Sequence, residues 1–190
     1  MLRIVTRAAS RGAALAVFVA LLSFSCGSEE PPETAESAPG SLQFSVDEEL
    51  LGPTQEFPTL GIEMNAPAEW EPQEAPETEE NPVEIERLYA GPGPSYLVVG
   101  TVRSEAPAQE TAEALAQDET DEVTQFTHNG ISFHQVRRIT EENVIFFLLF
   151  ATPENGKELG MLQFTVPSDE IENRARLIES SLGSVSSLDR

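Results

Sequence analysis

The chain has 190 residues and a formal net charge of −22, from 11 lysines and arginines against 33 aspartates and glutamates. A charge this negative repels nucleic acid and anionic lipid surfaces, so we expect no nucleic-acid partner. The single cysteine excludes an intramolecular disulfide, so a folded domain in this chain has to be held together by its hydrophobic core.

Residues 1–25 have the pattern of a signal peptide. Arg3, Arg7 and Arg11 precede an uninterrupted small and apolar stretch that runs from residue 12 to residue 22. A helix needs roughly 20 apolar residues to cross a bilayer, and this stretch is much shorter. The segment therefore predicts export rather than a permanent membrane span.

The only cysteine, Cys26, lies between the apolar stretch and an acidic segment. Ser23 and Ser25 are small and suit ordinary signal-peptidase cleavage before Cys26. The segment also resembles a bacterial lipoprotein signal, although Leu22 lies four residues before the cysteine rather than three and Phe24 takes the place of a small residue. That resemblance implies a lipid on Cys26, which would anchor the protein at a cell membrane or an outer membrane, facing the periplasm or the exterior. We interpret Cys26 as a lipidation site, with an ordinary secretory cut as the alternative.

Residues 26–40 predict a lipidated cysteine followed by a disordered acidic tether. The stretch after Cys26 contains three prolines, four glutamates and no large apolar side chain. Such a composition cannot offset the entropy lost on ordering. We expect the tether to lead into one globular domain at 41–185, followed by a C-terminal tail at 186–190.

The first half of the expected domain predicts strands and one long loop. Apolar residues alternate in 41–46 and in 59–65, as they do in half-buried strands. Residues 71–82 are rich in proline and glutamate and predict a long acidic loop. Residues 83–90 and 95–102 predict two further strands, joined by a Gly-Pro-Gly-Pro turn.

A helix and a hairpin follow. Residues 106–117 are rich in alanine, glutamate and glutamine, which favour a helix. An Asn-Gly pair between two alternating runs predicts a two-residue hairpin over residues 123–139. The register set by that turn pairs Phe126 with Phe133 on one face of the hairpin.

The last third predicts a buried hairpin and a final helix. Residues 144–151 are apolar without alternation, which indicates a strand covered on both faces. A strand at 159–166 and a helix at 168–183 follow, with Ser168 as the expected N-cap and Gly183 as the expected stop.

These elements together predict an α+β fold. A strand that is buried on both faces needs a covering layer on each side, and tight turns make neighbouring strands antiparallel. We therefore predict a mainly antiparallel β-sheet between helical layers, an α/β/α sandwich that closes with the C-terminal helix.

The order of these elements resembles the Mog1/PsbP/DcrB-like α/β/α fold, which is common among small bacterial lipoproteins. The matching segments are LGIEMNAPAEW at 60–70, the hairpins at 123–166 and FTVPSDEIENRARLIESSL at 164–182. The resemblance covers residues 41–185 and implies a non-catalytic accessory or assembly role in a larger complex. It does not identify the partner.

The residues that carry reactive groups form no recognised catalytic motif. The hairpin register places the two histidines, His128 and His134, on opposite faces, so one metal ion cannot readily bind both. We predict no metal site, no cofactor and no enzymatic activity.

Two features are candidate binding elements. Trp70 follows Pro67 at the end of a strand, where it either packs on the sheet or contacts a ligand, and we favour packing. The acidic loop is either a solvated loop or a docking site for a basic envelope protein. The glutamates that would form this docking site are Glu71, Glu74, Glu77, Glu79 and Glu80.

We thus expect a membrane-anchored exported lipoprotein that acts as a non-catalytic accessory or binding module of an envelope protein complex. One alternative is a carrier that holds a small apolar ligand between sheet and helix, which a cavity well above the size of one side chain would favour. A carboxylate-based hydrolase is a further alternative, which a pocket holding two neighbouring carboxyls would favour.

Overall fold

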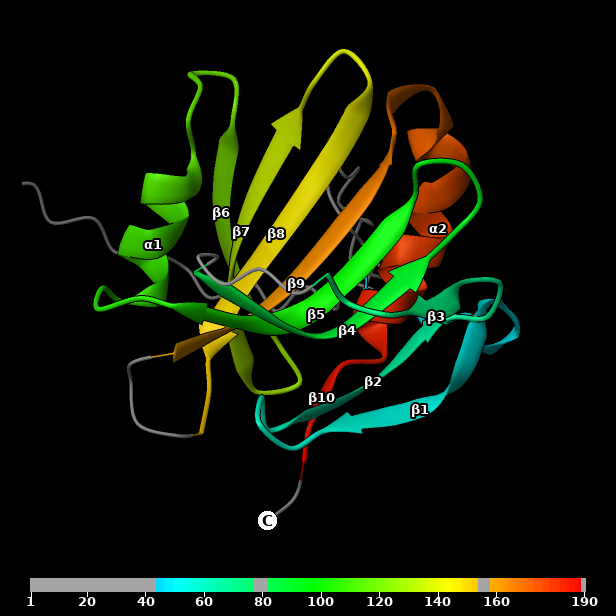
Figure 1. Ribbon diagram of the computed structural model, residues 1–190, viewed down its shortest axis with the longest axis horizontal. Helices are drawn as coiled ribbons and strands as arrows, with labels where there is room; N and C mark the ends of the chain where they lie inside the picture. The colour runs from blue at the N-terminus through cyan, green and yellow to red at the C-terminus, as the bar shows by residue number, and fades with distance from the viewer. Residues whose placement is uncertain (1–43, 77–81, 154–157, 189–190) are drawn as a thin grey trace, which may run out of the picture. The chain divides into compact units, whose positions relative to one another are not determined.

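The computed structural model describes residues 44–76, 82–153 and 158–188 (Figure 1). The predicted signal peptide, Cys26 and the predicted tether lie outside the described residues. The described residues belong to one compact unit that the chain enters after Ala38.

Most of the described strand residues lie in a seven-stranded sheet with the order β3-β4-β5-β9-β8-β7-β6, in which every neighbouring pair is antiparallel. Figure 1 shows this sheet running across the molecule from β6 to β3. Its strands are β3 (Glu71–Gln73), β4 (Val83–Ala90), β5 (Tyr96–Arg103), β6 (Glu122–His128), β7 (Ile131–Ile139), β8 (Asn143–Ala151) and β9 (Glu158–Pro167).

A smaller sheet with the order β1-β2-β10 packs against one face of the large one. Its strands are β1 (Leu51–Phe57), β2 (Ile62–Pro67) and β10 (Ser186–Ser187). The strand predicted at 59–65 is therefore present as β2, but it lies in a separate sheet. The C-terminal tail predicted from residue 186 was wrong in part, because Ser186 and Ser187 pair with β2.

The central strands are buried on both faces, as the apolar run at 144–151 predicted. Phe146 and Leu148 of β8 face the larger of two hydrophobic cores, whereas Leu149 faces the smaller one beside Met161 of β9. Such a strand pair is stable only when each face is covered by another layer.

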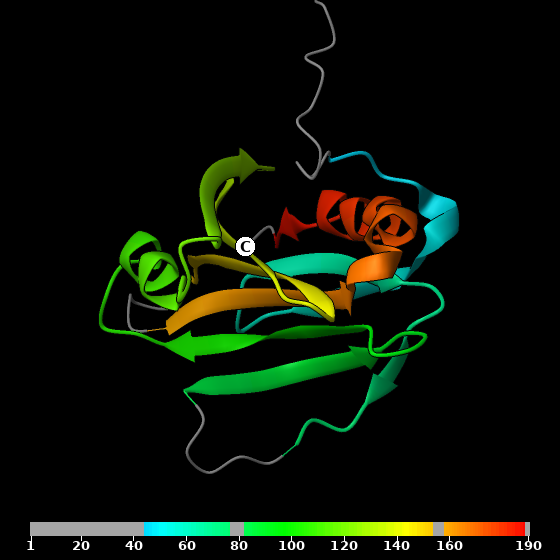
Figure 2. The ribbon, with the colours of Figure 1, turned by 90° about the horizontal axis from the view of Figure 1, so that it is seen from above.

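The two faces of the large sheet are covered differently. Helix α2 (Ile171–Gly183) and the small sheet cover one face, and helix α1 (Ala108–Leu115) covers part of the other over β7 and β8. Figure 2 shows the two helices on opposite sides of the twisted sheet. The α+β prediction of a mainly antiparallel sheet between layers is confirmed, with the correction that one layer is part helix and part β-sheet.

The hairpin predicted from Asn-Gly has the expected register, with Phe126 opposite Phe133. Asn129 and Gly130 both have positive φ, 47° and 78°, as the primed two-residue turns require. The hairpin tip also contacts the segment that follows α2, because the Asn129 side chain donates a hydrogen bond to the Val185 carbonyl at 2.7 Å.

Two local predictions were wrong. The described part of 41–46 forms no strand; instead the Phe44 ring packs on the hairpin, 4.8 Å from the Phe126 ring and 4.6 Å from the His128 ring. Ser168 does not cap α2, because its hydroxyl donates to the Thr140 carbonyl at 3.1 Å and the 3₁₀ turn η2 (Ser168–Glu170) precedes the helix.

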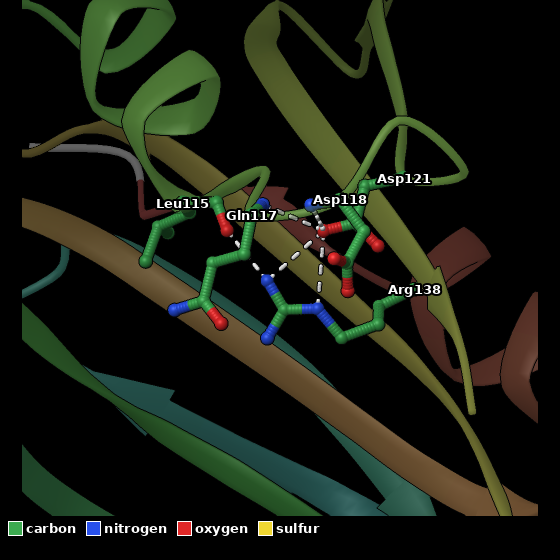
Figure 3. Close-up of polar contacts among 5 residues, drawn as sticks. All are labelled: Leu115, Gln117, Asp118, Asp121 and Arg138. Carbon is green, nitrogen blue, oxygen red and sulfur yellow. Dashed lines mark hydrogen bonds and ion pairs between the residues drawn. The ribbon is translucent and has the colours of Figure 1, made fainter. Parts of the chain in front are cut away.

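Helix α1 is held to the sheet by a buried ion pair between Asp121 and Arg138 (Figure 3). The Arg138 Nε and Nη2 atoms each lie 3.1 Å from Asp121 Oδ2, and Nη2 also donates to the Leu115 carbonyl at 2.5 Å. Leu115 is the last residue of α1, so the guanidinium lies at the negative end of the helix dipole. The same guanidinium lies 5.7 Å from the centre of the Phe147 ring.

We expect Asp121→Asn to lower the free energy of unfolding by about 3 kcal/mol at neutral pH, because it leaves Arg138 partly buried without its counter-ion. Glu122→Gln is the matched control, since the Glu122 side chain is 63% exposed and pairs with Arg137. Its loss should be below ~1 kcal/mol. Denaturant unfolding followed by circular dichroism measures both, and equal losses would contradict a structural role of the buried pair.

The Asp121–Arg138 ion pair also makes the stability of the fold depend on pH in the acid range. Burial raises the pKa of the Asp121 carboxyl, but hydrogen bonds from Arg138 and from the backbone amides of Gln117 and Asp118 outweigh it, so the pKa lies below its ordinary value of 3.8. A lowered folded-state pKa stabilises the fold above the ordinary value, and this stabilisation is lost as pH falls through the folded-state pKa. The stability difference between the parent and Asp121→Asn should therefore shrink in that acid range, and a constant difference would contradict the assignment.

Candidate functional site

A pocket of about 360 Å³ lies where the small sheet and the β3–β4 edge of the large sheet meet. This volume is within the range of pockets that bind small molecules, about 300–1,000 Å³. The lining residues come from β1, from the end of β2 and the turn after it, and from β3 and β4: Gly52, Pro53, Gln55, Ala66, Pro67, Ala68, Trp70, Pro72, Arg87 and Tyr89. We call this space the inter-sheet pocket.

The pocket forms where the chain crosses from one sheet to the other. Strand β2 ends at Pro67, a turn closed by the Trp70 amide and the Pro67 carbonyl at 3.1 Å follows, and β3 begins at Glu71. Because the residues that line the small-sheet side include Gly52 and Ala66, the gap between the diverging sheets is not filled by side chains.

Trp70 forms part of both the core and the pocket wall. It is 4% exposed, and its ring centre lies 6.3 Å from that of Phe164 in β9. A β-carbon at Gly91 would lie 2.5 Å from the indole Nε1, so glycine is needed there for the indole to pack as it does. This position agrees with the packing role that we favoured, and the place of Trp70 in the pocket wall leaves contact with a ligand as a prediction. The buried Nε1 atom has no hydrogen-bond partner among the described residues.

Arg87 and Tyr89 lie two residues apart on β4 and both line the pocket. Burial raises the pKa of the Tyr89 hydroxyl, and the charge of Arg87 acts in the opposite direction. The hydroxyl is therefore neutral at physiological pH. Within the described ranges, Arg87 is exposed and forms no ion pair.

Every other arginine in the described part of the chain has an acidic partner within 4.0 Å. The pairs are Arg103 with Glu84, Arg137 with Glu122, Arg138 with Asp121, Arg174 with Glu170 and Arg176 with Asp47. Arg87 is thus the described arginine without an ion pair within 4.0 Å, although its charge acts on the neighbouring Glu86 carboxyl, and it lies at the pocket.

The acidic loop is partly ordered into a strand. Residues 71–73 form β3, which pairs with β4 and places Pro72 opposite Tyr89. The prediction of a loop over all of 71–82 was wrong in part: Pro72 is tolerated in β3 because β3 is an edge strand and its outer side needs no amide donor. Glu71 and Glu74 are exposed; Glu77, Glu79 and Glu80 lie outside the described residues.

The histidines are not brought together. The His128 ring stacks on Phe44, and its Nε2 lies 3.0 Å from the Gly183 carbonyl at the end of α2. His134 pairs with Gln125 on the other face of the hairpin. In the part of the chain that the structure describes, no three His, Cys, Asp or Glu side chains are grouped so that they could hold a metal ion.

Two other hollows are weaker candidates. One of about 550 Å³ near β10 is lined by no charged side chain. Another of about 250 Å³ beside α2 includes Arg174 and Arg176, which already pair with Glu170 and Asp47. The inter-sheet pocket is the candidate site because it combines apolar walls with an arginine that has no ion pair among the described residues.

Comparison with protein-family models and with curated proteins found no match. Several solved structures are similar. PsbP (CyanoP) from Synechocystis sp. PCC 6803 is 13% identical, with a TM-score of 0.47 over 80% of this chain and 98% of that chain. The Ran-binding protein Mog1p of Saccharomyces cerevisiae is 12% identical, with a TM-score of 0.43 over 68% of this chain and 91% of that chain.

LpqN, which is involved in cell envelope biogenesis of Mycobacterium tuberculosis, is 11% identical, with a TM-score of 0.42 over 66% of this chain and 82% of that chain. A Bacteroides thetaiotaomicron structure is 14% identical, with a TM-score of 0.44 over 68% of this chain, which spans only 46% of that chain's length. PsbP and Mog1p are also the two fold types that the sequence resemblance named. At these identities the likeness concerns the fold alone.

Trp70→Ala should lower the free energy of unfolding by about 3–5 kcal/mol, because it removes a large buried side chain that packs on Phe164. Trp70→Phe keeps an aromatic ring and should cost clearly less. Since Trp70 is the only tryptophan, unfolding has to be followed by circular dichroism rather than by intrinsic fluorescence. Unchanged stability of Trp70→Ala would contradict its place in the core.

Proposed function

We propose that this chain is an exported, lipid-anchored and non-catalytic module that acts by binding. The observation that carries the proposal is the inter-sheet pocket, which has apolar walls, an arginine with no ion pair among the described residues, and no carboxylate among its lining residues. Such a pocket is built to hold a ligand rather than to transfer a proton or attack a bond.

The pocket lining argues against the hydrolase alternative. A carboxylate-based hydrolase needs two carboxyl groups facing the same reacting bond. The inter-sheet pocket is lined by no aspartate or glutamate. His128 does not line this pocket. Its ring packs on Phe44, and its Nε2 atom lies within hydrogen-bond distance of the Gly183 carbonyl.

The carrier alternative gains support from the volume of the pocket, which is well above that of one side chain. The site differs from the one anticipated, since it lies between two sheets rather than between sheet and helix. An accessory module and a carrier both work by binding, so the pocket supports either role within the same proposal.

The anchor belongs to the proposal as well. A lipid on Cys26 gives two or more acyl chains, which hold a protein stably at a membrane, whereas a single chain binds only marginally. The strongly negative chain would otherwise be repelled from an anionic bilayer. No helix in the described ranges is long and apolar enough to cross a membrane.

A basic envelope protein remains our proposed partner for the acidic segment. Glu71 and Glu74 are exposed beside Pro72, which lines the pocket, so a partner that docks on β3 would lie next to the inter-sheet pocket. Exposed charges of this kind act mainly on the rate of association.

Cys26→Ser should move the protein from the membrane fraction to the soluble fraction, because serine cannot accept the thioether-linked lipid. Ser28→Ala is the matched control, since it changes a hydroxyl in the same segment and leaves the thiol in place. Cell fractionation with an alkaline carbonate wash measures both. If Cys26→Ser and the parent fractionate alike, the anchor is wrong, whatever the pocket binds.

A further inference from the structure

We infer that the inter-sheet pocket binds a small organic anion with an apolar ring system, and that Arg87 holds the anionic group. This inference rests on the binding function proposed above and names the class of ligand for the same site. It is carried by the juxtaposition of a guanidinium that has no ion pair among the described residues with the aromatic and proline walls of the pocket.

Cations without an acidic partner are rare among the residues that the structure describes. With 33 acidic residues and 11 basic ones, an exposed arginine has many opportunities to form an ion pair, and five described arginines do so. Arg87 forms none with the described residues, although Glu86 is its neighbour in sequence. A guanidinium is a planar fork of donors that matches a carboxylate or sulfonate in a bidentate manner. An anion at the pocket would supply the partner that the described residues do not.

The walls determine the shape of the rest of the ligand. Trp70 and Tyr89 supply aromatic surface, and Pro53, Pro67 and Pro72 supply rigid rings. Rigid flat surfaces favour a ring system over a flexible chain, because little side-chain freedom is lost on binding. The neutral Tyr89 hydroxyl adds no negative charge, so nothing titratable in the lining opposes an anion at physiological pH.

A pair of probes separates the two parts of this inference. 8-Anilinonaphthalene-1-sulfonate carries an anionic group on an apolar ring system, and N-phenyl-1-naphthylamine has the same rings without the charge. Both absorb where tryptophan emits, so energy transfer quenches Trp70, the only tryptophan, when a probe binds this domain, and the lining variants below assign the binding to the pocket. The measurement uses the Cys26→Ser chain recovered after export, so that no acyl chain competes for an apolar probe.

We expect the sulfonate to quench Trp70 with a dissociation constant lower than that of the neutral probe. Arg87→Gln should weaken sulfonate binding about tenfold or more, as loss of a charged hydrogen bond does, and leave the neutral probe unchanged. Arg103→Gln is the matched control on the neighbouring strand, because that side chain is 74% exposed and does not line the pocket. It should change neither constant. Ala68→Phe, at an exposed lining residue, should weaken both probes by filling the pocket.

The possible failures are distinguishable. If the neutral probe binds in an Ala68-dependent way and Arg87→Gln leaves sulfonate binding unchanged, the ligand class is wrong while the binding function stands. An equal loss in Arg87→Gln and Arg103→Gln would show that only the overall charge matters, which also overturns the role of Arg87. If neither probe quenches Trp70, the pocket does not bind apolar rings, and the inference fails together with the pocket's role as a carrier site for apolar ligands.

Discussion

Both faces of the β8–β9 hairpin have to be covered, and the arrangement of the other elements follows from that requirement. Phe146 and Leu148 face one core while Leu149 and Met161 face the other. An antiparallel pair with two apolar faces is stable only between two layers. Helix α2 and the small sheet supply one layer. The short helix α1 supplies part of the other.

The short helix explains why a buried ion pair is present in a fold that otherwise depends on apolar packing. An eight-residue helix has little intrinsic stability in water. Arg138 joins its last carbonyl to Asp121 on the segment that leads into β6, so one side chain connects helix, turn and sheet. Removing either charge therefore acts on the attachment of α1 rather than on the core of the large sheet.

The use of two sheets also creates the inter-sheet pocket. The chain has to leave β2 and join the large sheet at β3, and Trp70 lies at that crossing. One residue thus closes the core against Phe164 and forms a wall of the pocket. Any ligand that binds only the folded pocket would stabilise the fold by mass action, so stability and binding are linked at this point.

Features that depend on local chemistry could be predicted from the sequence. The Asn-Gly turn fixed the hairpin register, and the unbroken apolar run at 144–151 identified the central strand. Strand β1 was not predicted, because Gly52 and Pro53 interrupt any alternation and the strand forms by pairing with β2. Strand β3 contains Pro72, which is acceptable only at a sheet edge, and edge position is a property of the whole sheet.

In the candidate site too, some residues could be predicted from the local sequence and others depend on how the strands pair. Trp70 could be identified as a candidate because it is the only tryptophan and follows Pro67 at the end of a predicted strand. Arg87 and Tyr89 could not, because they reach the pocket only through the pairing of β3 with β4. The lack of an ion pair between Arg87 and the described carboxylates depends on the positions of many side chains, which cannot be predicted from the sequence.

The most direct test of the account is a chemical-shift map of the isotope-labelled Cys26→Ser chain titrated with 8-anilinonaphthalene-1-sulfonate. The single indole N–H resonance belongs to Trp70, and its nitrogen has no partner among the described residues. The account predicts that this resonance shifts together with the amides of Gly52, Ala66 and Arg87, while those of the His128 hairpin tip stay in place. Shifts that leave the Trp70 indole unmoved and collect elsewhere on the domain would contradict a binding site between the two sheets.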